Sequence, residues 1–363
     1  MLDYSKFLNK KVVDIKPSGI RKFFSIAEEM DNVISLGVGE PDFLTPWHIR
    51  RTAIDYLDKG ATRYTANAGL ITLREEICNF YSRKYNIEYN PKNEVIVTVG
   101  GSEGIDMAIR TLISAGDEVL VVEPSFVCYK PIVETCGGMA VPLVTKEENN
   151  FKLIAESLEA AITDKTKLLI LPYPNNPTGA VMRKNELEAI AEVIIKHNLF
   201  DEIYGELTYG DEGHCSIASI ARMQERTIVI NGFSKTYSMT GWRLGYALGP
   251  EPVITQMTKL HQFAIMSAPT NSQYAAIEAL KNGDNDIKKM RDDYDMRRRF
   301  TVNSFREIGL DCFEPEGAFY VFPCIKSTGL SSDEFCERLI MEKRVAVVPG
   351  TAFGNCGEGF IRV

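Results

Sequence analysis

Between about residues 50 and 280, short runs of aliphatic and β-branched residues alternate with segments of helical periodicity. The runs that we expect to form strands cover residues 95–99, 118–122, 167–171, 227–231 and 244–248. Helical patterns lie between them, for example from residue 103 to about 113 and from 186 to 196. The runs are mostly apolar and show no alternation of polar and apolar residues, which is typical of strands that are buried on both faces of a sheet. The sequence therefore predicts an α/β protein with a mostly parallel central sheet between layers of helices.

The last third of the chain has a different pattern. We expect a long charged helix at 286–308, a second helix at 332–343 and strand-like runs at 318–322, 345–348 and 360–362. This pattern predicts a smaller α+β domain that is joined to the sheet by the long helix.

We therefore divide the chain into a large domain, residues 41–284, and a small domain that combines residues 1–40 with 285–363. The final strand-like run stops with the chain at Val363, without a closing helix. We expect the domain to continue beyond that residue.

Composition excludes several classes of protein. The 363 residues carry a formal net charge of -8, whereas nucleic-acid binding needs a basic face. No apolar run reaches membrane-spanning length, and the first residues lack the apolar core of a signal peptide. The eight cysteines are scattered without a Cys-x-x-Cys pair, and the four histidines are dispersed. We expect reduced thiols in a cytoplasmic protein, with neither disulfides nor a metal site.

The segment Ser-Lys-Thr-Tyr-Ser-Met-Thr-Gly-Trp-Arg at residues 234–243 directly follows the predicted strand 227–231. A lysine at the end of a strand can form a Schiff base with an aldehyde cofactor. Arg243, eight residues after Lys235, can hold a phosphate by paired hydrogen bonds. A solvated surface lysine is the commoner role, but the apolar strand before Lys235 favours pyridoxal phosphate (PLP) chemistry.

Two further turns follow predicted strands. Gly-Gly-Ser-Glu-Gly at 100–104 leads into a helix, where free N–H groups and the positive helix end can bind a phosphate. The alternative is a plain turn with a serine N-cap. Asn-Asn-Pro-Thr-Gly at 175–179 follows the strand 167–171 and could by itself be an ordinary turn.

In this order, the motifs resemble those of the class I/II aminotransferases, PLP-dependent enzymes with the type I, aspartate aminotransferase fold. The resemblance covers nearly the whole chain and is closest to bacterial aminotransferases for aspartate, aromatic amino acids or N-acetyl-diaminopimelate. It implies transfer of an amino group between an L-amino acid and a 2-oxo acid, by a ping-pong mechanism through pyridoxamine phosphate. It also implies a cytoplasmic homodimer with a shared active site.

The resemblance assigns the reacting end of the cofactor. Lys235 is implied as the Schiff-base lysine and proton shuttle. Asp201 is implied as the partner of the pyridine nitrogen, and Tyr204 as a donor to the phenolic oxygen. Asn176 is implied to bind that oxygen from the other side, and Phe126 to stack on the ring.

The resemblance also assigns the two anion sites. The phosphate is implied to bind Ser234, Arg243 and the turn of Gly101, Ser102 and Glu103, with the side chain of Glu103 pointing away. Tyr64 is implied to reach the phosphate of the neighbouring subunit.

The substrate's α-carboxylate is implied to bind Arg362, with Asn176 and Gly39 nearby. A surface arginine at a frayed end is the alternative reading of Arg362.

Three features depart from the family pattern. Gly232 stands where some members have a phosphate-binding serine. No arginine occurs between Arg243 and Arg291, so we do not expect a partner arginine to read an aspartate side chain; Arg21 is an alternative reader. Only residues 199–200 are left as a strand before Asp201, so this strand is either unusually short or lacks residues.

Other functions remain open at this point. A PLP-dependent β-lyase on the same fold would use the same cofactor site. A sensor domain of a transcription regulator would need a DNA-binding domain before the fold, and too few residues precede it. A dinucleotide-binding enzyme would need a Gly-x-Gly-x-x-Gly turn between a strand and a helix, which we do not find.

Overall fold

The computed structural model describes residues 2–17, 19–20, 26, 29–197, 200–204, 208–209 and 213–363, with residues 200–204 described by their backbone only. Within these residues the central sheet has seven strands, in the order β2-β8-β7-β6-β5-β3-β4. The strands are β2 (Val95–Thr98), β3 (Glu118–Glu123), β4 (Met139–Val144), β5 (Thr166–Leu171), β6 (Phe200–Tyr204), β7 (Thr227–Gly232) and β8 (Gly245–Leu248). Of these described strands, β8 alone runs in the opposite direction to the other six. The predicted α/β class with a mostly parallel sheet is confirmed.

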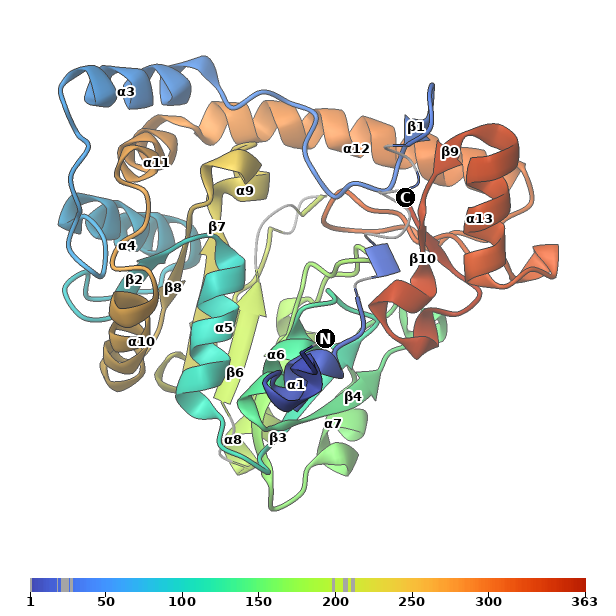
Figure 1. Ribbon diagram of the computed structural model, residues 1–363, viewed down its shortest axis with the longest axis horizontal. Coiled ribbons are helices and arrows are strands. Elements are labelled where there is room, and N and C mark those ends of the chain that lie inside the picture. Colours follow the sequence, from blue (N-terminus) through green and yellow to red (C-terminus); the bar gives the residue numbers. More distant parts are fainter. Residues whose placement is uncertain are drawn as a thin grey trace.

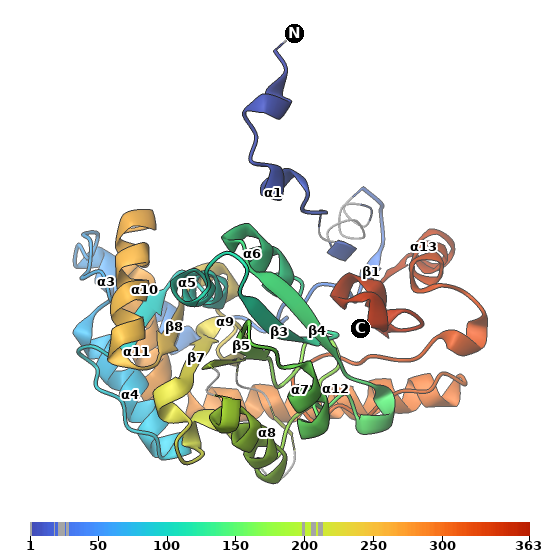
Figure 2. The same ribbon diagram turned by 90° about the horizontal axis from the view of Figure 1, so that it is seen from below.

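Helices cover both faces of this sheet, as Figure 2 shows. On one face lie α5 (Gly101–Leu112), α6 (Tyr129–Cys136) and α10 (Glu251–Ala264). On the other face lie α4 (Ile71–Tyr85), α7 (Ala155–Ala161), α8 (Lys184–His197) and α11 (Thr270–Asn282). The helix α3 (Trp47–Asp58) packs on α11.

Strand β7 illustrates why the strands do not alternate between polar and apolar residues. Ile228 and Ile230 belong to the core on the α5 side, and Val229 belongs to the core on the α4 side. Successive side chains of a strand point to opposite faces. Because both faces are buried, each position in β7 favours an apolar side chain.

The remaining elements form a smaller unit beside the sheet, seen in red on the right of Figure 1. The 24-residue helix α12 (Asp284–Glu307) leads to it, over roughly 36 Å at 1.5 Å per residue. The unit contains α13 (Ser332–Lys343), β9 (Val345–Ala346), β10 (Val348–Pro349) and β11 (Ile361–Arg362). Strand β1 (Ile34–Ser35), from the N-terminal region, pairs with β9.

The N-terminal segment extends away from the body of the protein in Figure 2. It contains the short helix α1 (Lys10–Val13), which contacts α6. None of the helices that the structure describes is long and apolar enough to cross a membrane.

Two predicted strands differ in the structure. Strand β6 has ordinary length because it continues through Asp201 to Tyr204, so Asp201 is not at its carboxyl end as predicted. The backbone of Asp201 pairs with Leu169 and Thr227, about 10 Å before the end of the strand at 3.3 Å per residue. Leu199 lies outside the described residues.

Residues 318–322 do not form the predicted strand. Val321 and Val363 exchange two backbone hydrogen bonds of 2.8 and 3.0 Å, but this single pair is too short for a strand. Ala318 has a left-handed backbone, with φ of 56°, and turns the segment toward the sheet.

Candidate active site

A cavity of about 340 Å³ lies where the chain leaves the central sheet. The residues that follow β2, β3, β5 and β7 meet there, because parallel strands end at the same edge of a sheet. Since β8 is antiparallel, Arg243, just before its first residue, joins the same edge. The predicted residues that line the cavity are Gly39, Gly101, Ser102, Phe126, Asn176, Ser234, Lys235, Arg243 and Arg362.

Lys235 lies in α9 (Phe233–Thr236), the helical turn that directly follows β7. Its Nζ donates a hydrogen bond to the carbonyl oxygen of Gly39 and lies 5.7 Å from the centre of the Phe319 ring. Burial lowers the pKa of Lys235 to about 8; Arg362 and Arg243 lower it further, whereas Glu40 opposes the shift. A lysine with such a pKa is a better nucleophile and proton acceptor at neutral pH than a surface lysine.

The segment around Lys235 is held by the loop that follows Gly39. The hydroxyl of Thr45 donates to the carbonyl oxygen of Ser238 at 2.5 Å, and the Trp242 indole donates to Thr45 at 3.0 Å. Thr240 in the same segment donates to the carboxylate of Glu40. These bonds position Lys235 and Arg243 from a part of the chain about 200 residues away.

The N-terminus of α5 contributes Gly101 and Ser102 to the lining of the cavity. Gly100 is the N-cap, and no side chain caps the helix, so the expected alternative of a serine cap is wrong. Gly100 has φ of +75°, and a Cβ there would lie 2.8 Å from a terminal nitrogen of Arg243. The turn and the guanidinium therefore fit closely together, and their free donors can serve one anion.

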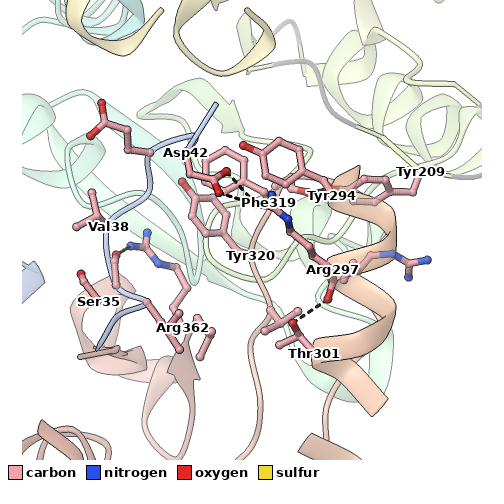
Figure 3. Close-up of a pocket in the computed structure, with 17 residues that line it drawn as sticks. Ser35, Val38, Asp42, Tyr209, Tyr294, Arg297, Thr301, Phe319, Tyr320 and Arg362 are labelled. Atoms are coloured by element: carbon pink, nitrogen blue, oxygen red, sulfur yellow. Dashed lines mark hydrogen bonds and ion pairs between the residues drawn. The ribbon is translucent and has the colours of Figure 1, made fainter. Parts of the chain in front are cut away.

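Arg362 is buried, with 3% of its surface exposed, and is not the frayed surface arginine of the alternative reading. One terminal nitrogen donates to Asn176 at 3.0 Å and the other to the carbonyl oxygen of Gly37 at 2.5 Å. Its guanidinium carbon lies 4.6 Å from the centre of the Tyr320 ring, and Figure 3 shows the two side chains together. Burial lowers the pKa of Arg362, but arginine stays charged in proteins.

A second cavity, of about 280 Å³, lies against the same wall of Phe319, Tyr320 and Arg362 (Figure 3). The other cations in its lining already have carboxylate partners. Arg297 pairs with Asp42 at 2.8 Å, and Arg298 pairs with Asp295 at 2.7 Å. We therefore place the chemistry in the first cavity, where Lys235 lies.

Two predicted residues that the structure describes, Tyr64 and Glu103, are not in the lining of the Lys235 cavity. Tyr64 lies on the surface, with 82% of its area exposed. The carboxylate of Glu103 turns to His261 and to the backbone N–H of Val99, so it points away from the cavity as predicted. The side chains of Asp201 and Tyr204, and all of Arg21, lie outside the described residues.

The structure adds residues that sequence reasoning missed. Tyr129 lines the cavity beside Phe126, with ring centres 6.2 Å apart, and Phe319 and Tyr320 arrive from the smaller unit. No local motif marks Phe319 or Tyr320, because only the return of the chain to the sheet brings them here. Gly39 was predicted, and the structure adds a reason: a Cβ there would lie 2.5 Å from the Tyr320 hydroxyl.

Comparison with known proteins decides the family. Residues 31–363 match the family described as aminotransferase class I and II. The chain belongs to this family. It is 52% identical over 361 residues to YugH of Bacillus subtilis (strain 168), named as an aminotransferase, covering 99% of this chain and 93% of that protein.

Two other relatives carry more specific names. An aspartate aminotransferase of Pyrococcus abyssi is 46% identical over 354 residues, which are 96% of this chain and 91% of that protein. The crystal structure of an aromatic aminotransferase from Pyrococcus horikoshii OT3 superposes with a TM-score of 0.90 at 44% identity, over 94% of this chain and 93% of that one.

The protein is thus a PLP-dependent aminotransferase with the type I fold. The cavity fits the cofactor at two of its ends. The α5 N-terminus, Ser234 and Arg243 offer donors for a phosphate, and the amine of Lys235 can meet the aldehyde. The side chains predicted at the ring nitrogen and phenolic oxygen lie outside the described residues, apart from Asn176.

Proposed function

We propose that the aminotransferase reaction takes place in the Lys235 cavity. The observation that carries the proposal is the separation of three cations within this cavity: Arg243 faces the α5 N-terminus, Arg362 faces Asn176, and Lys235 belongs to neither pair. When bound, PLP supplies an aldehyde for the amine and a ring that accepts electrons from the substrate.

Lys235 is the proposed covalent anchor and proton carrier. With a pKa of about 8, roughly a tenth of the amine is neutral at pH 7. The neutral Nζ would be the group that condenses with the aldehyde, with release of water. After the substrate amine has replaced it, the free Nζ would carry the proton from the substrate α-carbon to the C4′ carbon of the cofactor.

For the phosphate we propose the N–H groups of Gly101, Ser102 and Glu103, the Ser234 hydroxyl and Arg243. Phe126 covers the face of the ring. Asp201 and Tyr204 are proposed for the ring nitrogen and phenolic oxygen by resemblance alone.

Arg362 is the proposed clamp for the α-carboxylate of both the L-amino acid and the 2-oxo acid, with Asn176 and Gly39 beside it. An Arg362→Lys variant keeps the charge but loses the planar fork. We expect kcat/KM to fall about 10²- to 10³-fold, equivalent to about 3–4 kcal/mol, with an unchanged affinity for PLP. Equal losses in kcat/KM and in PLP affinity would contradict this assignment.

The Schiff-base assignment is tested by reducing the holoenzyme with borohydride and locating the labelled lysine by peptide mass mapping. We expect the label on Lys235, and no label and no activity in Lys235→Ala, whereas Lys259→Ala, an exposed lysine on α10, keeps both. Label on another lysine contradicts the site.

Incubation with single amino acids then separates the two PLP activities. An aminotransferase stops after one half-reaction, whereas a β-lyase turns over and releases ammonia and pyruvate. Aspartate, aromatic amino acids and N-acetyl-LL-diaminopimelate are the first donors to assay, since relatives are named for them.

We also propose a cytoplasmic homodimer, in which the exposed Tyr64 reaches the partner's phosphate site. The division into residues 41–284 and residues 1–40 with 285–363 belongs to the same proposal. Sedimentation analysis tests the dimer. Mixing Tyr64→Ala with Lys235→Ala tests the shared site, because only mixed dimers would contain one intact cavity.

A further inference from the structure

A buried pair of side chains lies directly behind the N-terminus of α5. His261 on α10 has 0% of its surface exposed, and its Nδ1 lies 2.8 Å from a carboxylate oxygen of Glu103. The other carboxylate oxygen of Glu103 accepts the backbone N–H of Val99. One carboxylate therefore joins α10 to the peptide that leads into the Gly100 turn.

Glu103 lies in the first turn of the helix whose N–H groups are proposed to bind the phosphate. Two anions then compete for one positive helix end, and they repel each other unless the carboxylate is directed elsewhere. The bonds to His261 and Val99 direct it elsewhere. Gly101 and Ser102 line the cavity, while the Glu103 side chain is 11% exposed and faces α10.

His261 has little other reason to be polar. Met257 and Leu260, on the same helix, belong to the apolar core on this side of the sheet. Among the described residues, its Nε2 is buried without a hydrogen-bond partner. Burying an imidazole with one satisfied nitrogen is costly, so the bond to Glu103 is the feature that accounts for a histidine here.

We propose that His261 is a positioning residue for cofactor binding. It holds the Glu103 carboxylate away from the phosphate, and through Val99 it aligns the Gly100–Ser102 turn. This inference rests on the proposed assignment of the cofactor phosphate to that turn. His261 itself touches neither cofactor nor substrate.

The test measures the affinity of the apoenzyme for PLP by fluorescence titration, and for inorganic phosphate by competition. In His261→Leu, the Glu103 carboxylate keeps only the Val99 N–H as a partner and can turn toward the phosphate. We expect PLP and phosphate to bind about 10- to 100-fold more weakly, the range for a buried charged group that loses its partner. At saturating PLP, kcat is expected to stay within about threefold of wild type.

Two variants separate this role from a loss of packing. His261→Asn keeps an N–H donor near the Nδ1 position, and its affinity is expected within about threefold of wild type. Adding Glu103→Gln to His261→Leu removes the negative charge, so PLP affinity should recover by at least fivefold. A purely structural role predicts no recovery, because the packing defect remains.

Met257→Leu is the matched control, since Met257 is fully buried one turn earlier on α10. Equal losses in Met257→Leu and His261→Leu, or no recovery with Glu103→Gln, overturn the inference. The variant Arg243→Leu tests the proposed phosphate site independently of His261. Unchanged PLP affinity in Arg243→Leu overturns the proposed phosphate site, whereas weak binding there with normal binding in His261→Leu overturns only the role of His261.

Discussion

Replacing Lys235 by methionine is expected to stabilise the cofactor-free protein while abolishing its activity. Burial is the largest cause of the lowered pKa of Lys235, about 8 instead of 10.5. A shift of 2.5 pKa units corresponds to roughly 3 kcal/mol of unfavourable free energy for the charged amine in the folded state, at 1.36 kcal/mol per unit. Methionine has a similar length and no charge, so it avoids this cost.

The pH dependence gives this prediction its sign. Below pH 8 the amine is charged in both the folded and the unfolded protein, and the full cost is present. Between pH 8 and 10.5 the unfolded state binds more protons, so the free energy of unfolding of the wild type rises with pH. The advantage of Lys235→Met should therefore be about 3 kcal/mol at pH 7 and should vanish near pH 11.

Urea denaturation of the two apoproteins at pH 7, 8, 9 and 10.5, followed by circular dichroism, measures this difference. Groups that titrate equally in both proteins cancel in it. Lys259→Met, at an exposed position, should show a difference near zero at each pH. A constant difference between pH 7 and 10.5, or a less stable Lys235→Met at pH 7, would refute the reasoning.

Two further predictions concern His48 and Gly100. Burial lowers the pKa of His48, but hydrogen bonds from its ring to the carboxylates of Glu278 at 2.7 Å and Asp286 at 3.0 Å outweigh it and raise the pKa. The contribution of the charged His48 to the free energy of unfolding is complete below the pKa of the unfolded state. It is lost as pH rises through the raised pKa of the folded state. Because the ring is 35% exposed, we expect this contribution to be less than about 1 kcal/mol. Wild type should therefore exceed His48→Gln in urea stability more at pH 5.5 than at pH 8.5, and equal differences would contradict it. Gly100→Ala should cost about 1–2 kcal/mol of stability and weaken PLP binding in a fluorescence titration, because the new Cβ meets Arg243. Gly116→Ala is the control, because Gly116 has φ of +92° and an added Cβ there would meet no atom within 4 Å. This control should lose stability but keep its affinity for PLP. Equal PLP affinities in the two variants would contradict the role of the Gly100 turn.

Most of the central sheet could be predicted from local sequence because β2, β3, β5, β7 and β8 each contain an apolar run without polar alternation. Strand β4 was not predicted, and Met139 and Val144 in it are exposed. Helix α13 was predicted with its observed bounds, and in the structure Ser331 and Glu334 form a capping box at its start. Helix α5 begins at Gly101, two residues before the predicted start, because Gly100 acts as the N-cap. Residues 318–322 have the composition of a strand, but strand formation depends on a partner, and among the described residues only Val363 pairs with them.

The same division holds for the site. Lys235, Arg243 and Asn176 stand in recognisable motifs that follow apolar strands, so the sequence by itself determined the cofactor chemistry and the edge of the sheet where it occurs. Tertiary structure decided what surrounds these residues: Tyr320 against Gly39 and Arg362, the loop from Glu40 to Thr45 against the lysine segment, and His261 behind Glu103. These contacts join residues about 40 to 280 positions apart in the sequence. Short-range patterns report backbone conformation and burial, whereas burial of charges and long-range hydrogen bonds arise only when the chain has folded.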